Sequence, residues 1–229
     1  MFEKEKFEKI CQIKIDNVDL YIEAMTHRSY LNENKNHPHP HNERLEFLGD
    51  AVLELVVTEH LFNNFNNPEG EMTAWRASLV NGEMLAQVAR EIGVEPFLMM
   101  SKGEAKDTGR ARNYLLANSI ESIIGAIYND KGYEESKKFI ESFIIIHLDE
   151  ILEKKLYLDP KSYFQEKAQQ HEDITPHYEV VGESGPDHDK KYIVGVFLKK
   201  EKIAEGEGIS KQDAQREAAR IGLEVKSWV

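Results

Sequence analysis

The chain contains very little cysteine and no long apolar run. One cysteine among 229 residues, Cys11, excludes an intrachain disulfide and a zinc site built from several cysteines. The longest apolar run, residues 143–148, is interrupted by His147 and is far too short to cross a bilayer. The N-terminal segment also lacks the apolar core of a signal peptide. These absences predict a protein of a reducing compartment, the cytoplasm, with no membrane partner.

The chain also lacks the basic excess that marks many nucleic-acid-binding proteins. It carries 29 Lys and Arg residues against 41 Asp and Glu residues, a formal net charge of −12. Residues 1–158 hold 18 basic and 27 acidic residues, and residues 159–229 hold 11 and 14. Composition therefore gives no support to a nucleic-acid partner, and any such function must come from a local arrangement.

The first two thirds of the chain have a helical pattern. Up to about residue 156, apolar residues recur at three- and four-residue spacing, which predicts amphipathic helices. Polar segments rich in Asn, Pro or Gly predict loops between them. The helices are predicted over residues 3–10, 17–27, 41–64, 72–92, 112–129 and 133–153, and the loops over 32–41, 63–70 and 103–112.

The last third has a different pattern, which predicts one helix, three strands and a final helix. Alternation with a period of two marks the strands, and Ser210 with Asp213 forms a capping box at the last helix. The elements are predicted over residues 161–170, 177–183, 191–199, 202–207 and from 210 onward. The predicted fold is therefore an all-α N-terminal domain over 1–153, a linker over 154–159, and an α+β domain of order α-β-β-β-α over 160–229.

Three carboxylates line one edge of the predicted helix over residues 41–64. At about 100° per residue, Glu46 and Asp50 lie within about 60° of Glu43 on the helix circumference. Like charges at this spacing repel one another by a few tenths of a kcal/mol, a cost that a divalent cation would turn into a gain. On spacing alone, a solvated acidic face remains the commoner explanation of such a trio.

Glycines in two helices favour the metal hypothesis. Gly49, in the middle of a helix, costs about 0.8–1 kcal/mol relative to Ala, and such a glycine usually marks the close approach of another backbone. The predicted helix over 112–129 carries Asn118 and Glu121, with Gly125 on the same side. Oxygen ligands on two facing helices would suit a hard divalent cation.

The segment from Asn42 to Asp50, NERLEFLGD, resembles the signature of the ribonuclease III family, the double-strand RNA endonucleases. Further blocks similar to that family occur in its order: THRSY at 26–30, EGEMT at 69–73, KGE at 102–104 and LANSIESIIGAIY at 116–128. The resemblance covers nearly the whole chain and includes a C-terminal double-stranded-RNA-binding domain.

The resemblance implies a set of site residues and a chemistry. The implied metal ligands are Glu46, Asp50, Asn118 and Glu121, and the implied catalytic residues are Asp50 and Glu121 with the auxiliary acids Glu43 and Glu69. An all-oxygen site suits Mg²⁺, for which Mn²⁺ can substitute. The family further implies a homodimer, products with 5′-phosphates and two-nucleotide 3′ overhangs, and a role in rRNA and mRNA processing.

One position departs from the family pattern. The family often has Asp where this chain has Asn118, which keeps a carbonyl oxygen but lacks a charge. We therefore expect weaker metal binding than in Asp-bearing relatives.

For the C-terminal domain, the resemblance implies contacts with the shape and backbone of A-form RNA. The implied RNA-binding residues are Gln165, Glu166, Gln169, His188, Lys211 and Arg216. Gln212 and Gln215 stand where family members often have basic residues, so RNA binding should be weaker than in a fully basic version. A small interaction module that does not bind RNA remains an alternative for this domain.

The predicted function is divalent-metal-dependent endonucleolytic cleavage of double-stranded RNA. The alternative is a non-cleaving double-stranded-RNA-binding protein on the same fold, which Asn118 keeps open. The intact set of Glu46, Asp50 and Glu121 favours the enzyme. The segment HPHPH at 37–41 is predicted to be an extended loop whose imidazoles point apart, with a soft-metal site as the alternative.

Overall fold

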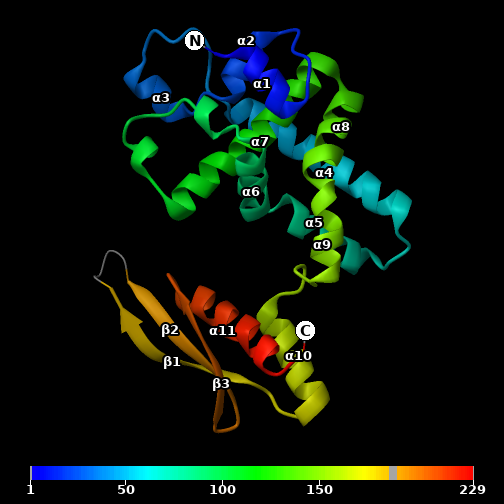
Figure 1. The fold of residues 1–229 in the computed structure, drawn as a ribbon, viewed down its shortest axis with the longest axis vertical. Coiled ribbons are helices and arrows are strands. Elements are labelled where there is room, and N and C mark those ends of the chain that lie inside the picture. The colour runs from blue at the N-terminus through cyan, green and yellow to red at the C-terminus, as the bar shows by residue number, and fades with distance from the viewer. Residues whose placement is uncertain (1, 186–189, 229) are drawn as a thin grey trace. The chain divides into compact units, whose positions relative to one another are not determined.

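The computed structural model describes residues 2–185 and 190–228, which belong to two compact units (Figure 1). The first unit spans residues 1–152 and the second spans 153–229. His188, one of the predicted RNA contacts, lies outside the described residues. None of the described helices has the length and apolar character needed to cross a membrane.

The first unit is built from helices packed around one central helix. These are α1 (Lys4–Cys11), α2 (Val18–Ala24), α3 (Arg28–Glu33), α4 (Glu43–Asn64), α5 (Glu69–Val80), α6 (Gly82–Ile92), η1 (Glu95–Phe97), η2 (Glu104–Lys106), α7 (Gly109–Lys131), α8 (Tyr133–Phe143), η3 (Ile145–His147) and α9 (Leu148–Glu153). Helix α7 packs against α4, α6, α2 and α8, and its residues are buried almost continuously from Leu115 to Ile127. The all-α prediction for this part is confirmed.

Three of the predicted helices are wrong in extent. The helix predicted over 133–153 is divided into α8, η3 and α9. At the other two, a side chain caps a new helix. The single helix predicted over 72–92 is two helices, since Asn81 Oδ1 accepts hydrogen bonds from the backbone N–H groups of Glu83 and Met84 at 3.0 and 2.9 Å. The helix predicted over 17–27 ends at Ala24. A separate helix, α3, begins after His27, whose side chain caps it.

Helix α4 leaves part of its apolar side exposed. Phe47 and Leu55 are 81% and 57% exposed, and Phe62 is 75% exposed. The buried side of α4 is made instead by a row that includes Leu45, Gly49, Val52, Leu53, Val56, Val57 and Leu61. Periodicity placed the apolar residues on a helix but did not separate those that face the core of this chain from those left outside it.

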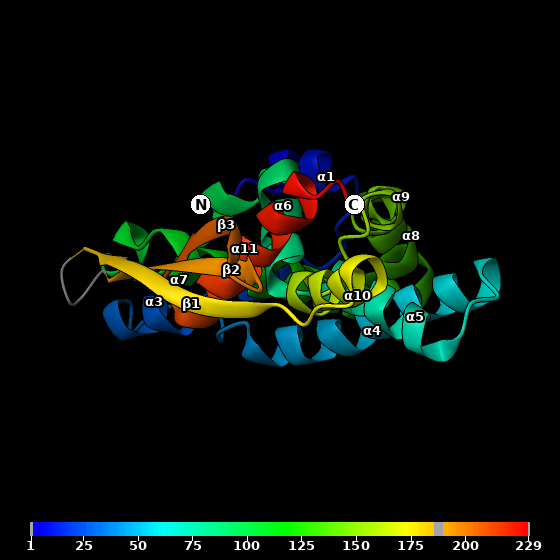
Figure 2. The ribbon, with the colours of Figure 1, turned by 90° about the horizontal axis from the view of Figure 1, so that it is seen from below.

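The second unit has the predicted order of helix, three strands and helix. Its elements are α10 (Pro160–Glu172), β1 (His177–Ser184), β2 (Lys191–Leu198), β3 (Glu201–Gly208) and α11 (Lys211–Val225). The strands form an antiparallel sheet in the order β1-β2-β3 (Figure 2), and α11 packs against β2, β3 and α10. Val196 and Leu198 of β2 pack with Phe164 of α10 in the core.

At the start of α11, Ser210 caps the helix as predicted, but Asp213 bonds to the Ser210 hydroxyl and not to its backbone N–H, so the capping box is only half formed. Ser210 Oγ accepts a hydrogen bond from the backbone N–H of Asp213 at 3.1 Å and donates one to Asp213 Oδ2 at 2.7 Å. Because these bonds satisfy a free donor of the first turn, they fix where α11 begins.

Candidate metal and cleavage centre

Helices α4 and α7 meet backbone to backbone at two glycines. A Cβ added at Gly49 would lie 1.7 Å from the carbonyl oxygen of Glu121, and a Cβ added at Gly125 would lie 2.1 Å from the carbonyl oxygen of Leu45. Both distances are far below a van der Waals contact, so neither position has room for a side chain. The close approach predicted from Gly49 is confirmed, and it sets the acids of α4 against those of α7.

The acids of α4 and α7 lie close enough together for their charges to shift pKa values. Burial, followed by the charges of Asp50 and Glu46, raises the pKa of Glu121 from 4.5 to about 7. Burial, followed by the charge of Glu43, raises the pKa of Glu46, while a hydrogen bond from Asn118 opposes that shift. The structure therefore sets Glu121 of α7 close enough to Glu46 and Asp50 of α4 for their charges to interact, and it sets Asn118 beside Glu46.

The donor set of this cluster fits a hard divalent cation. Within residues 2–185 and 190–228, Glu46, Asp50 and Glu121 make no ion pair with Lys or Arg. Over the same ranges, no three His, Cys, Asp or Glu side chains already converge as a metal-binding group. The donors are nevertheless all carboxylate and amide oxygens, and their mutual repulsion is the kind that bound Mg²⁺ or Mn²⁺ relieves.

The two auxiliary acids differ in position. Glu43 begins α4, where its Oε1 lies 3.6 Å from Arg28 Nη1 and its Oε2 lies 3.8 Å from His41 Nδ1. Glu69 begins α5 and is exposed, and in the described part of the chain it makes no hydrogen bond or ion pair with an acid of α4 or α7. Glu43 thus adjoins the cluster, whereas no contact joins Glu69 to it.

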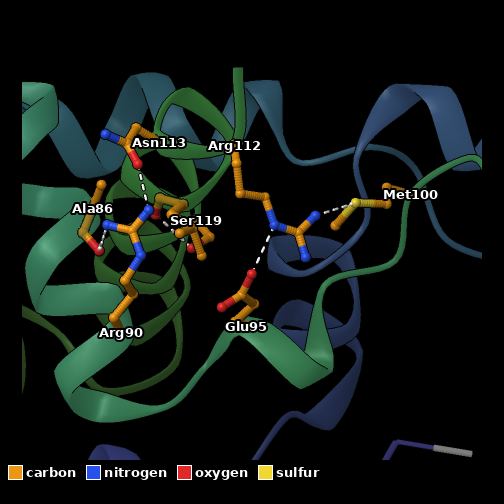
Figure 3. A network of polar contacts seen from close by, with 8 residues as sticks. Ala86, Arg90, Glu95, Met100, Arg112, Asn113 and Ser119 are labelled. Carbon is orange, nitrogen blue, oxygen red and sulfur yellow. Dashed lines mark hydrogen bonds and ion pairs between the residues drawn. The ribbon is translucent and has the colours of Figure 1, made fainter. Parts of the chain in front are cut away.

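Two arginines hold the start of α7 (Figure 3). Arg112 Nε donates a hydrogen bond to Glu95 Oε1 at 2.7 Å, and Arg112 Nη1 lies 2.8 Å from the sulfur of Met100. Arg90 donates a hydrogen bond to Asn113 Oδ1. The sequence pattern gave this region only as a polar loop over 103–112, because the partners of both arginines are distant in sequence. These contacts fix the first turn of the helix that supplies two of the predicted ligands.

The histidine segment before α4 is a loop, but its rings do not all point apart as predicted. The rings of His37 and His39 contact each other with centroids 5.4 Å apart, and His37 Nε2 lies 3.4 Å from Thr26 Oγ1. The prediction was wrong for this pair, because the chain bends at Pro38 and His39 instead of continuing straight. No three metal-binding side chains converge here among the residues that the structure covers.

The predicted RNA-binding residues of α10 form one exposed row. Gln165, Glu166 and Gln169 are exposed and line a groove of about 590 Å³ together with Ser162 and Gln170. The side-chain amide of Gln169 donates a hydrogen bond to Asp173, whereas Gln165 and Glu166 present their polar ends to solvent.

The start of α11 lies next to that of α10. Lys211 is the first residue of α11 and is exposed, and Arg216 Nε lies 3.6 Å from Asp159 Oδ1. Arg216 and Gln165 line a common pocket of about 400 Å³. Lys161, which the sequence patterns did not single out, lies in the same pocket and donates a hydrogen bond from Nζ to Gln215 Oε1 at 2.6 Å.

Two family models match the chain. One, described as Ribonuclease-III-like, matches residues 17–148, and the other, described as Double-stranded RNA binding motif, matches residues 160–226. The chain belongs to the ribonuclease III family. The chain is an endoribonuclease, in which a helical nuclease domain is followed by an α+β RNA-binding motif. The predictions of family, fold class and enzyme class are confirmed.

Named relatives cover almost the whole of this ribonuclease III chain. A protein of Desulforamulus reducens called Ribonuclease 3 is 43% identical over 208 residues, covering 90% of this chain and 85% of its own. A protein of the same name from Nitratiruptor sp. is 41% identical over 231 residues, covering 98% and 97%. The solved nuclease domain of ribonuclease III from Campylobacter jejuni is 38% identical with a TM-score of 0.56, covering 61% of this chain and 94% of that one.

Proposed function

We propose that the chain cleaves double-stranded RNA with a divalent metal ion held by Glu46, Asp50, Asn118 and Glu121. The observation that supports this proposal is the backbone contact of α4 and α7, because α4 carries Glu46 and Asp50 and α7 carries Asn118 and Glu121. Mg²⁺ is the proposed ion, and Mn²⁺ can substitute. The proposed products have 5′-phosphates and two-nucleotide 3′ overhangs, and the proposed role is rRNA and mRNA processing in the cytoplasm.

The proposed chemistry divides between the ion and the chain. When bound, the ion lowers the pKa of a bound water and stabilises charge on the scissile phosphate. Asp50 and Glu121 are the proposed catalytic ligands. Asn118 orients Glu46 by donating a hydrogen bond from its amide, which leaves the Asn118 carbonyl oxygen for ligation. Glu43 and Glu69 are proposed as auxiliary acids.

A homodimer is part of the same proposal. Three large apolar side chains of α4 are more than half exposed: Phe47, Leu55 and Phe62. Apolar side chains gathered on the exposed side of one helix are typical of a surface that a partner covers. A solved structure of the Campylobacter jejuni nuclease domain is described as having a region involved in dimer formation, which supports the same assembly here.

RNA binding is proposed for the second unit through Gln165, Glu166, Gln169, Lys211 and Arg216, with His188 as a further contact. The exposed row on α10 and the start of α11 support this assignment, because such domains bind through these two elements.

The experiment that tests the function is cleavage of a plain RNA duplex with and without Mg²⁺, followed by analysis of the product ends. Metal-dependent cutting to 5′-phosphate products supports the proposal. Binding of the duplex without cutting at any Mg²⁺ or Mn²⁺ concentration would favour the alternative, a non-cleaving binding protein, for which Asn118 is the specific observation.

Asn118→Asp should lower the Mg²⁺ concentration that gives half-maximal cleavage. The added charge strengthens metal binding, but in the metal-free protein it adds repulsion with Glu46, Asp50 and Glu121 and removes the hydrogen bond to Glu46. A Mg²⁺ titration of cleavage, with metal-free thermal melts of both proteins, measures the two effects. An unchanged or higher half-maximal concentration would show that Asn118 is not a weakened metal ligand.

Deletion of residues 159–229 should weaken duplex binding and make cleavage fail at a lower salt concentration. The second unit supplies backbone contacts that salt screens, whereas the proposed cleavage residues lie in the first unit. The truncated chain should still cut at low salt and high Mg²⁺. Loss of all cutting in a truncated protein that circular dichroism shows to be folded would mean that the second unit contributes to cleavage itself.

A further inference from the structure

The proposed cleavage centre is acidic, although its proposed substrate, RNA, is also negatively charged. Glu46, Asp50 and Glu121 carry like charges that repel one another, and they must approach the phosphates of RNA. Over residues 2–185 and 190–228, Arg28 is the only Lys or Arg that forms an ion pair with an acid of this region, through Glu43. A cation at this place would offset repulsion between the carboxylates and an RNA phosphate.

The backbone around Arg28 is tied to the start of α4. The carbonyl oxygen of Thr26 accepts a hydrogen bond from the backbone N–H of Asn42 at 2.9 Å, directly before α4 begins. On the other side, the backbone N–H of His27 donates to the carbonyl oxygen of Met99 at 2.9 Å. These bonds hold the first residue of α3 beside Glu43 whatever its side chain does.

The side chain of Arg28, in contrast, can exchange partners at low cost. It is 71% exposed, its Nη1 lies 3.6 Å from Glu43 Oε1, and Glu43 is itself 49% exposed. Exposed ion pairs of this kind contribute about 0–1 kcal/mol. A guanidinium binds a phosphate through two parallel hydrogen bonds, which are stronger than a long solvent-exposed pair.

We propose that Arg28 leaves Glu43 when RNA binds and contacts a backbone phosphate of the duplex beside the cleavage centre. This inference rests on the proposed function and adds a substrate-binding residue to it. The exchange places a positive charge between the acidic cluster and the RNA backbone, and it frees the Glu43 carboxylate at the same time.

The test compares Arg28→Ala, Arg28→Lys and a matched control, Lys138→Ala. Lys138 of α8 is 68% exposed and is also ion-paired, with Glu135. Duplex dissociation constants are measured over a salt series in the Glu121→Gln background to prevent cutting, and kcat and KM are measured in otherwise unaltered protein.

Arg28→Ala should lower the slope of log affinity against log salt concentration by about one, the value for one lost phosphate contact. Affinity at about 0.1 M salt should fall roughly three- to tenfold, since a charge-assisted contact is lost, and KM should rise more than kcat falls. Arg28→Lys should restore the slope, because it keeps the charge. Lys138→Ala should leave slope and KM unchanged.

An unchanged salt slope in Arg28→Ala would overturn the inference. So would a fall in kcat with an unchanged slope that Arg28→Lys does not restore, since Arg28 would then only orient Glu43. In either case cutting of the duplex by the unaltered protein would leave the proposed function standing. Failure of the unaltered protein to cut would instead reject the proposed function.

Discussion

Glu121→Gln should abolish cleavage of an RNA duplex while leaving duplex binding intact. The substitution keeps the shape of the side chain but removes a charged ligand from the proposed metal site, whereas the proposed RNA contacts lie elsewhere. We expect a loss on the order of a thousandfold or more in single-turnover cleavage. Cleavage within tenfold of the unaltered rate at millimolar Mg²⁺ would remove Glu121 from the site.

The melting temperature of the same variant should depend on pH, and this dependence also checks that the variant is folded. The pKa of Glu121 is about 7 in the fold, against an ordinary value of 4.5, so the folded state binds this proton more tightly than the unfolded state. Its contribution to stability therefore falls as pH rises from about 4.5 to about 7 and stays low above that. At pH 8 without metal, Glu121→Gln should melt at a higher temperature, by about 2–4 °C for each kcal/mol of repulsion removed. At pH 4.5 the two proteins should melt alike.

Gly49→Ala should destabilise the nuclease unit and destroy cleavage together. The new Cβ would lie 1.7 Å from a backbone oxygen of Glu121, and no side-chain rotation can relieve a collision with backbone. Overpacking typically costs about 1–3 kcal/mol and occasionally more, and a clash this short belongs at the upper end. The better helix propensity of Ala, about 0.8–1 kcal/mol, does not offset it. Chemical denaturation and duplex cleavage measure the two losses.

Gly70→Ala is the matched control for stability. It makes the same change in helix α5, where an added Cβ meets nothing within 4 Å. Because Ala has the better helix propensity, this variant should unfold at an equal or slightly higher denaturant concentration. A Gly49→Ala protein as stable as Gly70→Ala, with normal cleavage, would contradict the backbone contact between α4 and α7.

The helix contact at the centre could be predicted from sequence because its signals are local. The spacing of Glu46 and Asp50 follows from helix periodicity, and a mid-helix glycine such as Gly49 is costly unless another backbone approaches. The break between α5 and α6 also had a local signal, Asn81 before Gly82. An uninterrupted apolar period across it concealed that cap.

Other features could not be predicted because they depend on tertiary contacts. The pair of Arg28 and Glu43 exists because backbone bonds join Thr26 to Asn42, which lie far apart in sequence. The exposure of Phe47 depends on what surrounds α4, and a period of 3.6 residues shows only that it lies on an apolar side. The approach of the acids to one another is likewise set by two helices that are separated by more than 40 residues.

The contact at Gly49 and Gly125 also determines how the chain tolerates change. Main-chain atoms have no rotamers, so the spacing of α4 and α7 does not depend on how any side chain is repacked at that point. Volume-conserving substitutions elsewhere in the core can therefore accumulate without altering the distance between the proposed ligands. The stability of the nuclease unit could therefore be engineered separately from its chemistry, provided that both glycines are kept.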